Sequence, residues 1–240
     1  TEHKNVINTL DENALAEAIR VKSVMSEVKV TAISMGPPHA KKALREAIAL
    51  GADEAVLLSH RGFSGSDTLA TSKALARALA QAAGGELGEN DLVLCGERAT
   101  DGETGQVGPM VSGVLDVPVV TYVRKIVYED GCIVAERIVE DGLERVKTPL
   151  PAVITVVKDM NQPGFPTLSG KLRAKAVEIP VLTPDELDIC SCDVGLQGSP
   201  TRVAKVFRPR LSRDTITYQQ DSAGTAVDNL VSFLEMREII

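Results

Sequence analysis

The first half of the chain alternates short β-branched runs with longer stretches of helical periodicity, which narrows the possible folds to one class. Apolar runs predict strands over residues 28–35, 54–59, 91–96 and 119–123. Helical stretches begin near residues 9, 38, 67 and 106. Strands that alternate with helices form right-handed crossovers and a parallel sheet. We therefore expect an α/β protein.

Two helix ends carry recognisable signals. Thr9 and Glu12 have the spacing of a capping box, with Thr9 as the cap residue. The periodic residues after them predict an inward face formed by Leu15, Ala18, Ile19 and Lys22. Gly51 follows the second helix at a position where a left-handed cap is favoured.

The alternation of predicted strands and helices ends after about residue 124. Three shorter runs, joined by Asp130-Gly131 and Asp141-Gly142, predict antiparallel strands over 126–128, 132–138 and 145–148. A last apolar strand is expected over 152–157. Residues 158–222 are rich in proline and charge and lack periodicity, which favours an arm around another subunit. A closing helix carries Val227, Leu230, Val231 and Leu234 on one face.

Composition excludes several classes of function. The net charge is −7 and no basic block occurs, so a nucleic-acid partner is not expected. No apolar run reaches the roughly 20 residues that span a bilayer, so we expect no membrane insertion. The opening Thr1-Glu2-His3-Lys4 does not resemble a signal peptide. These features favour a cytoplasmic protein.

The four cysteines give no metal site by their spacing. Cys95 ends an apolar run and is expected to pack as a small hydrophobic residue. Cys190 and Cys192 would be half of a metal site, but no second pair has matching spacing, so we predict no metal. Unpaired thiols, Cys132 included, fit a reducing compartment.

Three loops are expected at the carboxyl ends of the strands, where open parallel sheets bind ligands. They are residues 35–38, 62–68 and 96–108. In the third loop, glycines allow backbone amides to approach an anion, and the helix that begins near Gln106 directs its positive end at the loop. A phosphate or pyrophosphate would fit, with Asp101 or Glu103 facing a ribose. A glycine-rich surface loop that only caps a helix explains the spacing equally well.

No catalytic residue stands out. His3, His39 and His60 have no acidic partner nearby in sequence, and no nucleophile elbow or zinc signature occurs. Redox chemistry would therefore require a bound cofactor.

The third loop and a segment after it resemble the β (small) subunit of electron-transfer flavoproteins. Residues 91–107 are similar to that family's nucleotide-binding segment. The family's β-subunit signature is matched at Ala135-Glu136-Arg137, Glu140-Asp141-Gly142, Glu144, Val146, Pro151 and Val153-Ile154-Thr155. Asn8 lies where the family has an Asn-Pro beside the nucleotide, although Thr9 replaces the proline.

This resemblance implies a Rossmann-like nucleotide-binding α/β domain over residues 1–157 and an arm with a closing helix over 158–240 that wraps the α subunit. The α subunit would hold the main FAD, and this chain would hold either AMP or a second FAD. Family members have a central strand ahead of the segment that matches Asn8, and the given sequence starts without it. The implied cofactor-binding residues are Asn8, Met35, Gly36, Pro37, Asp67, Thr68, Thr71, Gly96, Arg98, Ala99, Asp101, Gly102, Thr104, Gly105, Gln106, Val107, Val120 and Thr121.

The resemblance also implies partners. Thr167-Leu168 is similar to the loop whose leucine docks on acyl-CoA dehydrogenases or related flavin dehydrogenases. Residues 34–40, 66–72 and 198–201 resemble the electron-bifurcating subtype, in which a second FAD accepts hydride from NADH. Its pyrophosphate would lie on residues 96–106, with the isoalloxazine toward residues 35–37, 67–68 and 120–121. The alternatives are a non-bifurcating subunit with structural AMP and a stress-protein-type regulatory module, which has no use for the arm.

Overall fold

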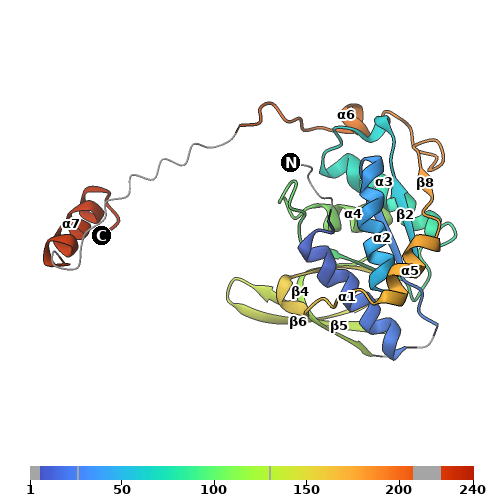
Figure 1. The fold of residues 1–240 in the computed structure, drawn as a ribbon, viewed down its shortest axis with the longest axis horizontal. Helices are drawn as coiled ribbons and strands as arrows, with labels where there is room; N and C mark the ends of the chain where they lie inside the picture. The colour runs from blue at the N-terminus through green and yellow to red at the C-terminus, as the bar shows by residue number, and fades with distance from the viewer. Residues whose placement is uncertain (1–5, 26, 130, 208–222) are drawn as a thin grey trace. The chain divides into compact units, whose positions relative to one another are not determined.

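The structure is a computed structural model that describes residues 6–25, 27–129, 131–207 and 223–240 (Figure 1). Two compact units, Thr1–Arg202 and Val203–Ile240, are described separately. The helices are α1 (Thr9–Val24), α2 (Lys41–Leu50), α3 (Thr68–Ala82), α4 (Val107–Leu115), α5 (Leu168–Ala176), α6 (Gly195–Gly198) and α7 (Ala223–Met236), with short 3-10 turns η1 (Pro38–Ala40), η2 (Arg61–Phe63) and η3 (Lys158–Met160). The strands are β1 (Thr31–Met35), β2 (Glu54–Leu58), β3 (Leu92–Gly96), β4 (Val119–Glu129), β5 (Cys132–Val139), β6 (Gly142–Pro149), β7 (Ala152–Val156) and β8 (Val181–Leu182).

The strands form two sheets. The first has the order β1-β2-β8 and is parallel throughout. The second has the order β3-β7-β4-β5-β6, in which β3, β7 and β4 are parallel and β5 and β6 continue antiparallel. The expected α/β class and antiparallel extension are therefore confirmed. The separate strands predicted over 119–123 and 126–128 are instead one strand, β4, with a register shift between Val120 and Val123. Asp130 of the first predicted turn lies outside the described residues.

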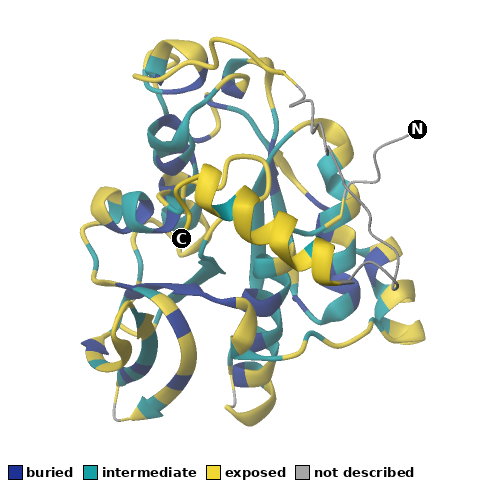
Figure 2. Ribbon diagram, turned by 90° about the vertical axis from the view of Figure 1, so that its left-hand side faces the viewer, coloured by how far each residue is buried: buried dark blue, intermediate teal, exposed yellow. Residues whose placement is uncertain are grey.

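Both faces of the parallel strands are covered by helices, which explains why they are apolar without alternation. Ala55 and Leu57 of β2 pack with α2, whereas Val56 and Leu58 pack with α3. In the second sheet, every residue of β7 is buried. Figure 2 shows the buried residues along the strands and on the inward sides of the helices.

The two sheets are bridged by helices that pack on both. α1 contributes Ala14 to the core of the second sheet and Leu15 to the cluster around Val30 beside β1. α3 likewise contributes to clusters on both sheets. Within the described residues, β1 pairs only with β2 and β3 only with β7, and every residue of β1 and β3 is only half-buried.

The inward side of α1 is broader than the predicted face. Leu15 and Ala18 pack in the cluster around Val30 as predicted. The most deeply buried residues are Asn13, Ala14, Glu17 and Val21, whereas Lys22 pairs with Asp53 at the surface. Buried Asn13 is satisfied because its Nδ2 donates to the backbone oxygen of Asn161 at 2.8 Å. Polar residues therefore occupy inward positions that a search for apolar periodicity overlooks.

Residues 158–202 pack onto the α/β unit, so the first unit extends beyond the expected boundary at residue 157. β8 pairs with β2, and Arg173 of α5 donates to the carbonyls of Ile48 and Ala52 after α2. Ile179 and Leu187 are buried. Residues 158–202 therefore bury side chains although they lack periodicity, because their few apolar residues are spaced irregularly. Residues 208–222 lie outside the described part.

The second unit contains the closing helix, which is α7. Val227, Leu230 and Val231 are exposed, whereas Leu234 is half-buried. Arg237 lies over the ring of Phe233 at 5.3 Å. No helix within the described residues has the length and apolar character needed to cross a membrane.

Candidate functional site

The loop between β3 and α4 starts directly beneath the N-terminus of α1. The backbone N–H of Gly96 donates to Asp11 Oδ1 at 2.7 Å. A Cβ atom on Gly96 would lie 2.7 Å from the Cβ of Leu10, so a side chain would push α1 away. The glycine at the strand end therefore sets the position of α1 over the loop.

Asn8 connects α1 to the same loop. Its Nδ2 donates to the backbone oxygen of Arg98 and to Asp11 Oδ2, both at 2.9 Å. Its Oδ1 is buried and has no hydrogen-bond partner among the described residues. A buried acceptor left without a donor costs about 1–3 kcal/mol, so this atom is suited to a donor supplied by a ligand.

The predicted capping box at the start of α1 is wrong. The cap residue is Asn8, and within the described part of the chain no side chain caps the first amides. The reason is visible in the contacts of Asn8, whose amide group turns toward the loop at Arg98.

The far end of the loop is held close to the strand ends. Gly105 has φ +65°, and a Cβ atom there would lie 3.4 Å from the carbonyl oxygen of Glu97 and 3.7 Å from the Tyr122 hydroxyl. Gln106 is the cap residue of α4, but among the described residues its side chain accepts no hydrogen bond from the first amides of the helix. Thr68 Oγ1 lies 3.3 Å from Gln106 Oε1, so the N-termini of α3 and α4 meet beside the loop.

Tyr122 occupies the register shift of β4 and has φ +59°. A positive φ is uncommon for a bulky residue and is typical of functional sites. The conformation is supported by a hydrogen bond from its backbone N–H to Thr155 Oγ1 at 3.2 Å. The shift leaves Tyr122 46% exposed, with its hydroxyl near Gly105.

A cleft of about 450 Å³ opens between this loop, α1, the register shift of β4, the end of β5 and the residues after β7. It is lined by Thr9, Leu10, Glu97, Arg98, Thr100, Glu103, Tyr122, Ile138, Val157, Lys158 and Asp159. The charged lining residues are three acids and two bases. Side-chain charge therefore offers no strong attraction for phosphate, and backbone amides at the start of α4 are the better-suited anion ligands.

The carboxylate of Asp67 is fully occupied by protein donors. Oδ1 accepts from the amides of Leu69 and Ala70, and Oδ2 accepts from the amide and hydroxyl of Thr201. Burial alone would raise the pKa of Asp67, but these hydrogen bonds outweigh it, so the pKa lies below its usual value. Asp67 thus caps α3 and holds residue 201.

The other predicted site residues differ in how accessible they are to a ligand. The side chains of Met35, Val107 and Val120 pack in the core. Thr121 Oγ1 accepts from Arg137 at 3.2 Å. The backbone N–H of Gly36 donates to the carbonyl oxygen of Leu58, and Pro37 precedes η1. Thr71 is half-buried in the first turn of α3. Ala99, Asp101, Gly102 and Thr104 are exposed on the loop.

Sequence reasoning missed Tyr122, Glu97, Lys158 and Asp159, which line the cleft. Glu97 follows β3 directly, and the pair Lys158-Asp159 follows β7 after Val157, so position near a strand end could have suggested them. Tyr122 carries no such signal, because the register shift that exposes it is not encoded by a glycine or proline.

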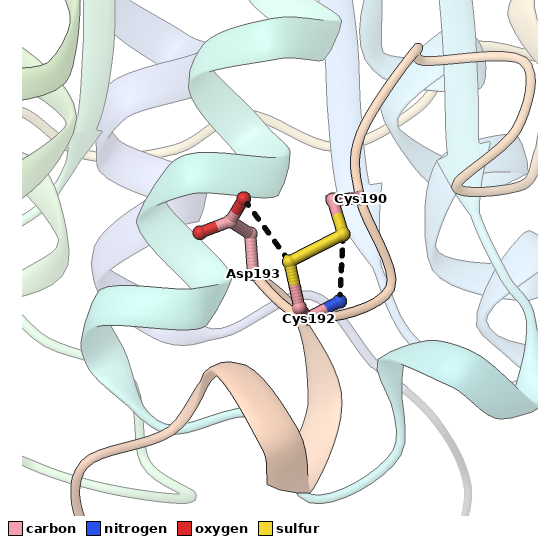
Figure 3. A group of neighbouring side chains, drawn as sticks. All are labelled: Cys190, Cys192 and Asp193. Atoms are coloured by element: carbon pink, nitrogen blue, oxygen red, sulfur yellow. Dashed lines mark hydrogen bonds between the residues drawn. A yellow bond between two sulfur atoms is a disulfide. The ribbon is translucent and has the colours of Figure 1, made fainter.

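The cysteines differ from the prediction at one pair. Cys190 and Cys192 form a disulfide with Asp193 beside it, so these thiols are not unpaired (Figure 3). The two sulfur atoms and a carboxylate oxygen of Asp193 lie within 4.8 Å of one another, but the sulfurs could bind a metal ion only after reduction to thiolates. Cys95 and Cys132 are free thiols. Burial, aided by the charge of Asp11, raises the pKa of Cys95 to about 12.

The predicted docking residues begin α5. Thr167 is the cap residue, and its Oγ1 accepts from the amide of Gly170 at 3.0 Å. Leu168 is 77% exposed, and Phe165 and Leu172 are exposed beside it in sequence.

Comparison with known proteins gives consistent matches. The family profile described as electron transfer flavoprotein domain matches residues 1–187. The electron transfer flavoprotein subunit beta of Thermoanaerobacterium thermosaccharolyticum is 43% identical over 237 residues, covering 98% of this chain and 88% of the relative. The caffeyl-CoA reductase-Etf complex subunit CarD of Acetobacterium woodii is 36% identical, and the acryloyl-CoA reductase electron transfer subunit gamma of Anaerotignum propionicum is 35% identical, with the same coverage of both chains.

Proposed function

The chain belongs to the electron transfer flavoprotein family as a β subunit, and we propose that its nucleotide site holds FAD as a second flavin. In this proposal the heterodimer takes hydride from NADH and bifurcates the electron pair. When bound, a flavin supplies the hydride acceptance and one-electron steps that amino-acid side chains lack.

The observation that supports a nucleotide site here is the buried Oδ1 of Asn8, which has no hydrogen-bond partner among the described residues and lies beside the loop at Arg98. The adenine amino group or a ribose hydroxyl is a donor of the required kind. Asn8 would then orient the nucleotide through Oδ1 while its Nδ2 keeps the loop in place.

The amides at the start of α4 would bind the pyrophosphate. Thr104, Gly105 and Gln106 precede α4, and the positive end of the helix favours a negative charge by about 0.3–1 kcal/mol. Gly105 leaves this approach open because it lacks a Cβ atom.

Two of the three stretches that resemble the bifurcating subtype contact each other. Ser199 Oγ accepts from the amide of Asp67 at 2.8 Å, and Thr201 donates to the carboxylate of Asp67. These contacts join residues 66–72 and 198–201 into one wall at the N-terminus of α3. Because the two stretches contact each other, we expect them to shape the nucleotide site together.

The relatives support a partner of acyl-CoA type. Two of them are named as subunits of caffeyl-CoA and acryloyl-CoA reductase systems. By analogy, we assign this chain a flavin dehydrogenase or reductase of an acyl-CoA as electron partner, with Leu168 at the docking surface. β subunits of this family pair with an α subunit, and the exposed apolar side of α7 is suited to such a contact. A cytoplasmic location belongs to the same proposal.

The alternative is a β subunit that holds AMP and shapes the α-subunit flavin site. The contacts of Asn8 and of the loop serve an AMP moiety equally well, because both nucleotides share it. The resemblance of residues 66–72 and 198–201 to the bifurcating subtype favours FAD, because these two stretches pack together through Asp67, Ser199 and Thr201.

Substitution of Gly105 by valine tests the site. The strain of a β-branched residue at φ +65°, of order 1–2 kcal/mol, adds to the loss of close approach for phosphate. In the heterodimer, Gly105→Val is expected to remove the nucleotide of this chain and NADH oxidation while the α-subunit FAD stays bound. Flavin and AMP released on denaturation provide the measurement.

Gly131→Val is the matched control. Gly131 has φ +74° with no neighbouring atom within 4 Å among the described residues, and it lies in the turn after β4. The control carries similar backbone strain without a place in the proposed site. Equal nucleotide content in both variants and the parent would refute the location of the site.

A further inference from the structure

The disulfide between Cys190 and Cys192 lies on a segment that is anchored on both sides. Leu187 precedes it and Val194 follows it, and both are buried in the cluster that contains Leu58 and Phe63. Cys190 and Cys192 themselves are exposed. Solvent can therefore reach the sulfur atoms while the chain on either side stays fixed.

The pair is suited to reversible chemistry. The Cα atoms are 5.1 Å apart, within the range that a disulfide spans without movement of the backbone. Exposed disulfides exchange with small thiols because an attacking thiolate can approach them. Cys95 offers a contrast, since its thiol is buried and its pKa is raised to about 12, which makes it unreactive.

Residues 193–201 connect this pair to the loop before α3. Asp193 Oδ1 lies 2.6 Å from Lys73 Nζ on α3. The amide of Gly195 donates to Ser66 Oγ at 2.9 Å. A Cβ atom on Gly195, which has φ +61°, would lie 2.2 Å from the carbonyl oxygen of Gly62, so the two chain segments are in direct contact.

The same connection ends on Asp67. Ser199 Oγ accepts from the Asp67 amide, and Thr201 donates twice to its carboxylate. Every step from Asp193 to the cap of α3 is therefore a hydrogen bond, ion pair or backbone contact between named groups.

We propose that Cys190 and Cys192 are a reversible thiol–disulfide modification site whose state sets how firmly residues 193–201 hold the loop at residues 62–68. The co-reactant is a small-molecule disulfide. One cysteine thiolate attacks it, forming a mixed disulfide and releasing one thiol. The other cysteine then attacks the mixed disulfide and releases the second thiol. The two cysteines lose two electrons and two protons, and the external disulfide becomes two thiols.

Asp193 is the group that transmits the change. In the disulfide neither sulfur carries a proton, and the carboxylate of Asp193 pairs with Lys73. In the reduced state the Cys192 thiol, 3.9 Å from Asp193 Oδ2, gains a proton to donate. The thiol can then draw Asp193 toward Cys192 through Oδ2, whereas Lys73 binds Oδ1. Opening of the three-residue ring also frees the adjoining backbone. Reduction should therefore loosen the contacts of Gly195, Ser199 and Thr201.

The test uses the full chain in its complex with an α subunit. The complex is treated with glutathione disulfide or with dithiothreitol, and free thiols of this chain are counted by alkylation and mass. Oxidation should remove two thiols from the parent and from Cys132→Ser, and none from the Cys190→Ser/Cys192→Ser variant. An unchanged thiol count in the parent would overturn the proposal.

Hydrogen exchange of residues 66–71 tests the coupling. In the reduced parent these amides should exchange about threefold faster than in the oxidised parent, because local opening depends on the contacts that hold them. The double serine variant should match the reduced parent under both treatments. Loss of two thiols without a change in exchange would overturn the coupling.

Protection of both thiols by added Zn²⁺ against glutathione disulfide would instead make Cys190, Cys192 and Asp193 a metal site. The exchange test does not depend on the nucleotide, whereas any effect on nucleotide binding rests on the proposed function.

Discussion

At the scale of single residues, the site depends on side chains and glycines whose positions are set by neighbouring elements. Tyr122 has a positive φ because β4 shifts register there, and Thr155 of the adjacent strand stabilises the turn. Asn8 leaves one buried oxygen without a donor among the described residues. A strained φ or an unpartnered buried oxygen persists where a ligand or partner compensates for its free-energy cost. Tyr122 and Asn8 therefore mark functional positions on both sides of the loop at Gly105.

Asp67 predicts a pH dependence at the same scale. Its hydrogen bonds lower its pKa below the usual 3.8. The stabilisation is therefore fully present above that pH and is lost as the pH falls through the lower folded-state value. Asp67→Ala, which removes the cap of α3, should cost about 1 kcal/mol near neutral pH, and the difference in melting temperature from the parent should shrink toward about pH 3.

Asp67→Asn is the matched variant for that experiment. Asparagine keeps an acceptor for the amides of Leu69 and Ala70 but does not titrate. Its melting difference from Asp67→Ala should stay constant over the same pH range. If the difference in melting temperature between the parent and Asp67→Ala is also independent of pH, the carboxylate contributes nothing through its charge.

Leu168 is predicted to act in docking and not in folding. It is 77% exposed at the start of α5, and an apolar anchor at an interface centre can contribute about 2 kcal/mol. Leu168→Ala should slow electron transfer to the acyl-CoA-type partner and leave melting and nucleotide content unchanged. Leu143→Ala, an exposed leucine on β6, is the control. Equal transfer rates for parent and Leu168→Ala would refute the assignment.

At the scale of elements, periodicity predicted most strands and helices of residues 9–157 to within a few residues. It failed where tertiary contacts override local signals. The start of α1 is one such place, because Asn8 bonds to the loop at Arg98 instead of to its own helix. The packing of residues 158–202 is another, since Ile179 and Leu187 are buried without any period that a sequence pattern could reveal. The loop of residues 96–107 could be located from its glycines, whereas the cleft beside it required the register of β4.

The unpaired edges of β1 and β3 predict uneven protection of backbone amides. β7 is paired on both sides and wholly buried, whereas the described residues leave one edge of β1 and of β3 unpaired. Amides on those edges should exchange with solvent about 100-fold faster than amides of β7. Peptide-resolved hydrogen exchange of this chain provides the measurement. Uniform protection across β1, β3 and β7 would mean that both edges are covered.

At the scale of the whole molecule, the chain is a component of an assembly. Its second unit exposes apolar residues of α7, including Val227 and Leu230, and large exposed apolar surfaces mark interaction sites. Its first unit combines the loop before α4, the cleft at Tyr122 and the exposed Leu168. Membership of the electron transfer flavoprotein family relates these features, since a β subunit of that family pairs with an α subunit and with a dehydrogenase.

The central claim, that this β subunit holds a second flavin, is tested most directly by the nucleotide content of the purified heterodimer. The complex is denatured with acid, and the released nucleotides are separated by chromatography and counted per heterodimer. We predict two FAD and no AMP, because Asn8 and the loop at Gly105 would hold the AMP moiety while residues 66–72 and 198–201 would contribute to the site of the flavin. One FAD and one AMP would contradict it and identify a non-bifurcating subunit.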